Sequence, residues 1–302
     1  MTTRTTYTLF ALASAIFSGA GWVLTEVGLR FYGMGSVSMA FIGNLTGGLL
    51  LLALTTGPRR KPWPRWPRRT WLLVIAASFA IYALGFQLSF NAIGLIGSGK
   101  AVLLARLDVF FVIIMAILFL GEHFSPRHWL AGGFAIGGAI LITLKPGALE
   151  LTFGWGEVLA VLAPLCNASG VIILKLAVDR IDTGQMTAMA LLCGALFLSP
   201  LLFFDATFST LILPAVLVTI LMGVARGLAW LFYNISMRHL GPARASLIFL
   251  SSGFFTILFQ VSLASLMPRL GLQPPQNLTS ALMGGVLIAI GIVILQTGKA
   301  EG

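Results

Sequence analysis

Gly97 to Phe111 reads GSGKAVLLARLDVFF, and Gly241 to Phe255 reads GPARASLIFLSSGFF. The two stretches align at a constant separation of 144 residues. Glycine then falls on glycine at the start, a cation on a cation three positions later, and a Phe–Phe pair on a Phe–Phe pair at the end. Further along, the Gly–Gly pair that opens GGFAIGG (132–138) recurs in GGVLIAIG (284–291). Repetition at this distance predicts a chain built from two related halves.

The composition of the chain identifies lipid as its solvent. Hydrophobic residues make up 58% of the 302 residues, and charged residues only 9%. Soluble domains carry about 25% charged residues, so this chain could not cover a surface that faces water. A helix that crosses a bilayer needs about 20 apolar residues. The composition therefore predicts an all-α integral membrane protein.

Proline, glycine and charged residues divide the chain into ten apolar runs, which we interpret as ten transmembrane helices. Their approximate ranges are 7–29, 36–56, 71–91, 98–119, 126–144, 155–175, 184–204, 210–234, 241–263 and 278–297. The first run lacks a small-residue cleavage site and is interpreted as a span rather than a signal peptide.

The distribution of lysine and arginine predicts the orientation of these spans. With the N-terminus in the cytoplasm, thirteen of the nineteen cations fall in cytoplasmic segments and four on the other side. Cytoplasmic loops are enriched in Lys and Arg, so both termini are predicted to be cytoplasmic. Six of these cations lie in the Pro- and Trp-rich loop 57–70, which either contacts anionic lipid headgroups or anchors the topology. The net charge of +10 therefore does not indicate a nucleic-acid partner.

Five spans in each half is an odd number, so the second half enters the membrane from the opposite side. The repeat is then inverted, with a pseudo-two-fold axis in the membrane plane and a central cavity between the halves. We predict a first repeat at 1–145, an extracytoplasmic linker at 146–154 and a second repeat at 155–302, together forming one transmembrane domain. In such folds the substrate site lies at the interface between repeats.

This arrangement resembles the drug/metabolite transporter superfamily, EamA type. The stretch LFLGEHFSPRHWLAGGFAIGGAILI (118–142) carries the resemblance, with a Leu-Gly-Glu turn, a polar stretch and a Gly-rich fifth span. The second half departs from the pattern, because SLASLMPRLGLQPPQ (262–276) replaces that turn. The family's proline midway in the fourth and ninth spans is also missing.

Within that family, the chain is most similar to the bacterial aromatic amino-acid exporters, the type also linked to methyl viologen efflux. GWVLTEVGLRF (21–31) contributes to this likeness. The resemblance implies a multi-pass protein of the bacterial inner membrane that exports small metabolites by alternating access. It leaves open whether a monomer or a homodimer operates.

Charged residues inside spans are functional candidates, because a charge costs at least about 2.5–3.5 kcal/mol at the bilayer centre. Arg106 and Asp108 lie in the fourth predicted span and Arg226 in the eighth. Arg106 and Asp108 sit about 200° apart on a helix and need different partners. Asp108 and Arg226 could bind the ammonium and carboxylate of an amino acid, or form a packing pair between helices. For proton coupling, Asp108 and Glu26 are the carboxylates that could carry the proton.

Polar and aromatic residues inside spans extend the candidate site. One helix stripe with spacings of four and three holds Arg226, Trp230, Tyr233 and Asn234. Aromatic rings in a cavity would suit flat apolar side chains and flat cations. Packing between helices is the alternative for each residue. The further candidates are Trp22, Asn44, Tyr82, Asn91, Asn167, Ser251 and Ser252.

Several motifs are absent from the sequence. No GxxxxGK[ST] loop is present, so ATP does not drive this chain by itself. No catalytic, cofactor or metal-ligand spacing occurs, and Cys166 and Cys193 lie unpaired in apolar runs. We therefore predict a secondary or facilitative transporter and no enzyme. The resemblance implies that it exports small metabolites, with aromatic or apolar amino acids as the expected substrates. An importer or carrier of another metabolite or drug, a passive channel, or an integral-membrane lipid-handling enzyme are the alternatives.

Overall fold

A computed structural model of the chain describes residues 3–56, 65–105, 107–121, 126–143, 154–179 and 181–270, with a few further residues between 272 and 294. Every regular element in these ranges is helical. The α-helices are α1 (Thr3–Glu26), α2 (Ser36–Thr55), α3 (Arg68–Ser78), α4 (Phe86–Ala105), α5 (Leu107–Leu120), α6 (Pro126–Thr143), α7 (Trp155–Val178), α8 (Thr183–Leu198), α9 (Leu213–Leu240), α10 (Pro242–Phe249) and α11 (Ser252–Leu266). The π-helical segments η1 (Val27–Phe31) and η2 (Phe79–Gly85) and the 3-10 segments η3 (Ser199–Phe204), η4 (Ala206–Thr210) and η5 (Pro268–Leu270) complete the order.

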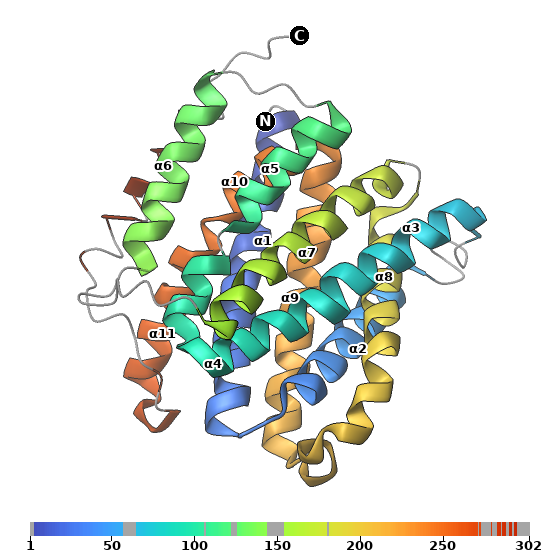
Figure 1. The fold of residues 1–302 in the computed structure, drawn as a ribbon, viewed down its shortest axis with the longest axis vertical. Helices are drawn as coiled ribbons and strands as arrows, with labels where there is room; N and C mark the ends of the chain where they lie inside the picture. The colour runs from blue at the N-terminus through green and yellow to red at the C-terminus, as the bar shows by residue number, and fades with distance from the viewer. Residues whose placement is uncertain are drawn as a thin grey trace.

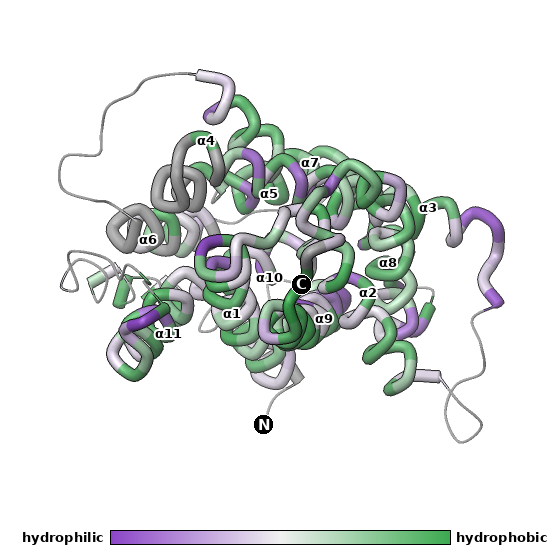
Figure 2. The backbone as a smooth tube through the Cα atoms, turned by 90° about the horizontal axis from the view of Figure 1, so that it is seen from below, coloured by the Kyte–Doolittle hydropathy of each residue, from purple (hydrophilic) through white to green (hydrophobic). Residues whose placement is uncertain are grey.

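The helices are long and apolar enough to make this a multi-pass membrane protein. Seven spans in the described residues meet both criteria, at Thr5–Phe31, Ser36–Thr55, Arg68–Ala92, Trp155–Val178, Thr183–Phe204, Leu213–Leu240 and Pro242–Leu266. Each agrees with a run predicted from the sequence. In Figure 2 the backbone is hydrophobic along most of these helices, and the hydrophilic stretch that begins α3 stands apart at one edge.

The remaining three predicted spans are matched less completely. Shorter apolar helices occur at Leu107–Leu120 and Trp129–Gly138. The predicted connection between the third and fourth spans falls inside α4, because residues 92–97 contain no charge or proline that would end a helix. The tenth span, 278–297, and the predicted linker lie mostly outside the described residues. The count of ten spans in two repeats therefore stays a prediction.

The helices form two layers. In Figure 1, α3, α4, α5 and α7 lie in front of α1, α2 and α9, and the view from below in Figure 2 separates the same two layers. Within the front layer, α7 packs against α3, η2, α4 and α5. Within the rear layer, α9 packs against α1 and α2, while α8 contacts helices of both layers. Each layer thus combines helices from both predicted halves.

Glycine allows α2 and α9 to cross in backbone contact. A Cβ added to Gly47 would lie 2.6 Å from the carbonyl oxygen of Gly223, and one added to Gly223 would lie 2.6 Å from that of Gly43. A Cβ added to Gly227 would in turn lie 3.0 Å from the Cα of Gly47. Small residues permit this close approach, which increases van der Waals contact where lipid gives helices no hydrophobic reason to associate.

A carboxylate from another segment caps the start of α2. The N-cap residue is Gly35, which has no side chain to offer. Instead, Asp205 Oδ2 accepts hydrogen bonds from Ser38 N at 2.9 Å and from Ser38 Oγ at 2.7 Å. Thr207 donates to Asp205 Oδ1 through both its N–H and its hydroxyl, and Gly35 N donates to Thr207 Oγ1. The η3–η4 connection is thereby joined to α2, with a negative charge at the helix N-terminus.

The α2–α9 crossing gives a first prediction. Gly47→Ala should lower the stability of the protein by about 1–3 kcal/mol, the usual cost of overpacking, because the added methyl forces two backbones apart. Thermal unfolding in detergent measures this. Gly133→Ala is the matched control, because no described atom lies within 4 Å of its added Cβ. Equal melting temperatures for the two variants would contradict the contact.

The cap on α2 gives a second prediction. Burial alone would raise the pKa of Asp205, but hydrogen bonds from Thr207 and Ser38 outweigh burial and lower it below its ordinary value of 3.8. A carboxyl with a lowered folded-state pKa stabilises the fold above its unfolded pKa, and this stabilisation is lost as pH falls through the folded value. Asp205→Ala should cost about 0.5–2 kcal/mol at neutral pH, as lost caps do.

Unfolding midpoints measured across pH test this assignment. The difference between wild type and Asp205→Ala should stay constant from about pH 5 to 8 and shrink only below about pH 4. Asp205→Asn, which keeps a capping oxygen without the titrating charge, should restore much of the stability at neutral pH. A difference that changes near neutral pH would show that another group is responsible.

Candidate functional site

A cavity lies between the two layers. Its empty space, including the part open to the outside, is about 1020 Å³. Six helices contribute to its wall. The lining residues are Ser18, Gly21, Trp22 and Thr25 of α1; Phe86, Ser89 and Ala105 of α4; Asp108 and Val112 of α5; Asn167, Ala168 and Val171 of α7; Arg226, Ala229, Trp230 and Tyr233 of α9; and Ser246 and Phe249 of α10.

Arg226 projects from α9 into this cavity without an acidic partner. Its guanidinium carbon lies 3.6 Å from the centre of the Phe86 ring. No described residue forms an ion pair or a hydrogen bond with it, and Asp108 is not paired with it although both line the cavity. Gly21 makes room for the arginine stem, because a Cβ there would lie 3.0 Å from Arg226 Cγ. The N–H groups of Arg226 are therefore available to a bound anion.

Two polar residues of the front layer face the same space. Asp108 lies in the first turn of α5, and Asn167 lies in α7, three residues after Pro164. The Oδ1 atom of Asn167 is buried against Gly85 and has no hydrogen-bond partner among the described residues. The cavity thus holds a carboxylate and an amide opposite the arginine.

Aromatic rings form much of the remaining wall. Trp22, Phe86, Trp230, Tyr233 and Phe249 all line the cavity. Trp230 and Tyr233 pack edge to face with ring centroids 5.6 Å apart, as do Tyr233 and Phe249 at 5.5 Å. The Tyr233 hydroxyl is 2.6 Å from Ser246 Oγ, which joins α9 to α10 beside the cavity. These rings can bury a flat apolar group.

The structure brings together six of the residues singled out in the sequence. Trp22, Asp108, Asn167, Arg226, Trp230 and Tyr233 line one cavity. The predicted stripe on α9 is among them, because residues 226, 230 and 233 all face inward. Asn234 leaves the stripe and donates to Thr187 Oγ1 on α8.

Two further candidates lie behind the wall instead. Tyr82 is fully buried, and its ring packs edge to face on Trp230 with centroids 5.2 Å apart. Asn44 donates through Nδ2 to the carbonyl oxygen of Tyr82 at 3.1 Å. This carbonyl belongs to π-helical η2, whose wider turns leave backbone groups that need other partners. Asn44 therefore supports a helix irregularity and does not reach the cavity.

The other candidates also lie elsewhere. Asn91 is exposed and outside the cavity wall. Ser251 and Ser252 are buried at the turn between α10 and α11, where the Ser251 hydroxyl donates to Ile248 O at 2.8 Å. Neither serine lines the cavity. Arg106 lies outside the described residues.

Glu26 is placed between helices at the end of α1. Its Oε2 accepts a hydrogen bond from Gln260 Nε2 at 2.6 Å, and its Oε1 is 3.5 Å from Arg30 Nη1. It does not line the cavity. Glu26 thus ties α1 to α11, whereas Asp108 is the carboxylate that faces the cavity.

Sequence reasoning missed several lining residues. The face of α1 beside Trp22 carries small and polar residues at helical spacing, namely Ser18, Gly21 and Thr25. This pattern in the sequence could have identified the face as one that lines a cavity. Phe86 lies one helical turn from Tyr82, but an apolar residue in a span carries no sign of which face it occupies. Only the packing of α4 against the cavity identifies it.

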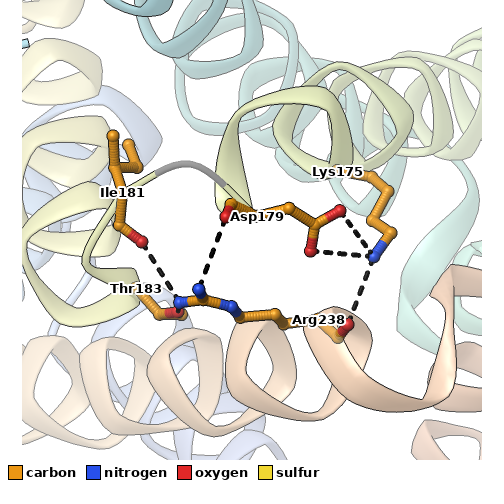
Figure 3. A network of polar contacts seen from close by, with 5 residues as sticks. All are labelled: Lys175, Asp179, Ile181, Thr183 and Arg238. Carbon is orange, nitrogen blue, oxygen red and sulfur yellow. Dashed lines mark hydrogen bonds and ion pairs between the residues drawn. The ribbon is translucent and has the colours of Figure 1, made fainter.

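A cluster of polar contacts joins the layers at the end of the bundle where α1 begins. Lys175 of α7 contacts both carboxylate oxygens of Asp179, at 3.1 and 3.2 Å, and donates to the carbonyl oxygen of Arg238 at the end of α9 (Figure 3). Arg238 donates to the carbonyl oxygens of Ile181 and Asp179 and to Thr183 Oγ1. We call Lys175, Asp179 and Arg238 the clasp.

The clasp suits the chemistry of helix ends. Its two cations bind carbonyl groups that the last turns of α7 and α9 leave unpaired, and they favour the negative ends of the helix dipoles. Beside it, the rings of Tyr7 and His239 stack with centroids 3.7 Å apart. In the described residues the opposite end has a weaker link between layers, from Ser36 Oγ to Gln87 Oε1 at 3.4 Å.

Comparison with known proteins agrees with this architecture. Residues 5–144 and 154–297 match the EamA-like transporter family. A curated relative from Streptantibioticus cattleyicolor, described as a probable terminal-alkyne amino-acid exporter, is 27% identical over 274 residues, covering 89% of this chain and 86% of the relative. A protein of known crystal structure shares the fold with a TM-score of 0.75 over 97% of each chain, at 18% identity.

Proposed function

Because the chain belongs to the EamA-like transporter family, we propose that it exports amino acids with apolar or aromatic side chains from the bacterial cytoplasm. The family and the exporter-named relative identify a transporter of small molecules and not an enzyme. The choice of amino acids as substrates is supported by the cavity and by the description of that relative.

The observation that carries the proposal is Arg226. A cation within the membrane is costly unless something neutralises it, and no described residue forms an ion pair with this one. A substrate carboxylate would supply the missing charge, and two parallel N–H···O bonds would give it a defined orientation. The aromatic wall then receives the side chain.

Asp108 is the proposed partner of the substrate ammonium. It lines the same cavity on the opposite layer, so the two charges can lie on either side of one bound molecule. If transport is coupled to protons, Asp108 is also the better carrier, because it lines the cavity and Glu26 does not. Proton-coupled and uncoupled export both remain compatible with this assignment.

We further propose the topology that the sequence predicts. Two inverted five-helix repeats at 1–145 and 155–302 would place both termini in the cytoplasm and the protein in the inner membrane. The two matches to the family, at 5–144 and 154–297, lie close to these boundaries and support the division. Alternating access would then open the cavity between the layers first to one side and then to the other.

The clasp is the proposed lock of the cytoplasmic side. It joins α7 of the front layer to α9 of the rear layer at the end where α1 begins. Opening the cavity to the cytoplasm requires these helices to separate there, so the contacts in Figure 3 would have to break during each cycle.

The proposed substrate site gives a third prediction. In proteoliposomes, labelled Phe, Trp, Tyr or Met should show saturable uptake with mutual competition. Arg226→Gln should raise KM by about tenfold or more, the scale expected when a charge-assisted carboxylate contact is lost. Asp108→Asn should weaken binding of the free amino acid but not that of its N-acetyl derivative.

Two further measurements complete this test. Thermal unfolding of each variant separates lost binding from lost folding, and an imposed pH gradient shows whether flux is proton-coupled. If it is, Asp108→Asn should abolish the response and Glu26→Gln should retain it. Failure of all four amino acids to compete, with folded protein present, would refute the proposed substrate class.

The clasp gives a fourth prediction. In a variant with Cys166 and Cys193 replaced by serine, Ser246→Cys reports access to the cavity from the cytoplasm. Adding Lys175→Ala or Arg238→Ala should increase its labelling by an impermeant maleimide in inverted vesicles. Loss of about 1 kcal/mol, typical of one net hydrogen bond, shifts the ratio of the two states about fivefold.

The control for this experiment is Arg30→Ala, which removes a cation at the opposite end of the bundle. It should not increase cytoplasmic labelling. If Lys175→Ala and Arg238→Ala behave like Arg30→Ala while remaining folded, the clasp does not hold the cytoplasmic side closed.

A further inference from the structure

The contact between Arg226 and Phe86 reaches across the cavity from one layer to the other. The guanidinium carbon of Arg226, on α9, lies 3.6 Å from the ring centre of Phe86, on α4, and 5.9 Å from that of Phe90. Both rings are almost fully buried, with 6% and 5% exposure. A guanidinium this close to an aromatic face is held by the ring's electrostatic quadrupole.

The Phe86 ring is itself fixed by its neighbours. The Tyr82 ring packs against it at an angle of 64° with centroids 5.9 Å apart, and Trp230 packs against Tyr82 in turn. The Phe90 ring stacks on Phe86 with centroids 6.2 Å apart. Four aromatic residues thus pack in a row, from Trp230 through Tyr82 and Phe86 to Phe90, and the arginine lies over the Phe86 ring.

An aromatic ring and a carboxylate would hold Arg226 with different consequences. A carboxylate would neutralise the cation and occupy its N–H donors, which lie in the guanidinium plane. A ring attracts the cation through one face and leaves those in-plane donors unoccupied. Because no described acid pairs with Arg226, its charge and its donor edge stay available to a ligand.

We propose that Phe86 is a positioning residue that orients Arg226 for the substrate carboxylate. This inference rests on the proposed function and assigns different roles to two residues of the site. Arg226 contacts the carboxylate, and Phe86 determines the plane in which the carboxylate must approach. Phe86 acts through the arginine, so its loss should affect ligands with a carboxylate and spare ligands that lack one.

The test compares phenylalanine with phenylalaninamide, which has the same ring and ammonium but no carboxylate. Both are measured as competitors of labelled phenylalanine uptake in proteoliposomes. In wild type the acid should compete better than the amide. In Phe86→Leu, the acid should lose about tenfold in apparent affinity, the scale of a desolvated cation–π contact, while the amide changes little.

Two other variants make the result specific. Phe86→Tyr keeps the aromatic face and should retain the preference for the acid. Phe79→Leu is the matched control, because it makes the same substitution in the preceding segment, where the side chain is 49% exposed on the outside of the bundle. It should leave both competitors unchanged. Phe86→Met serves the same purpose as Phe86→Leu if the leucine variant does not fold.

The outcomes separate this inference from the proposed function. If wild type prefers the acid but Phe86→Leu weakens acid and amide equally, Phe86 is only part of the wall and the positioning role is wrong. If the acid keeps its full advantage in both Phe86→Leu and Phe86→Met, the role is also wrong. If wild type transports no amino acid, or does not distinguish acid from amide, the proposed function fails first and the role of Phe86 fails with it.

Discussion

The site depends on the close crossing of α2 and α9. Gly43, Gly47, Gly223 and Gly227 let the two backbones approach closely, with the Met222 side chain packed against Gly43. In lipid, helices gain nothing from hiding apolar surface, so close packing on α2, together with packing on α1, holds α9 against the first half of the chain. Since α9 carries Arg226, Trp230 and Tyr233, the glycines determine how far these side chains reach into the cavity.

The polar groups of the interior follow two patterns. Most form hydrogen bonds that stabilise the fold, because every backbone group inside a membrane needs a partner. Asn44 donates to the carbonyl oxygen of Tyr82, and Ser14 donates to that of Ala229. Arg226 is different, because an aromatic face holds it and no described acid pairs with it. This contrast is the reason why we propose Arg226 as a binding group.

Hydropathy predicted the spans well because a helix that crosses the bilayer must be apolar over about 20 residues. Seven of the ten predicted runs coincide with long apolar helices in the described residues. The site was predicted only in part. Helical spacing found the stripe at 226, 230 and 233, but Asn44, Tyr82, Asn91, Ser251 and Ser252 do not line the cavity. In a span that is apolar on all sides, the sequence gives little indication of which face is directed toward the cavity. A polar residue in such a span can form a hydrogen bond with the backbone of a neighbouring helix instead of lining the cavity.

The sequence by itself determined that this chain is a helical bundle within a membrane. It also placed a cation, a carboxylate and an aromatic stripe within the spans. These properties depend on composition and local spacing, which each segment carries alone. Only the tertiary structure decided that Phe86 lies beneath Arg226, that Glu26 is engaged with Gln260, and that Lys175 reaches the end of α9. Those contacts join residues far apart in the chain, and they exist because packing between helices selects which faces meet.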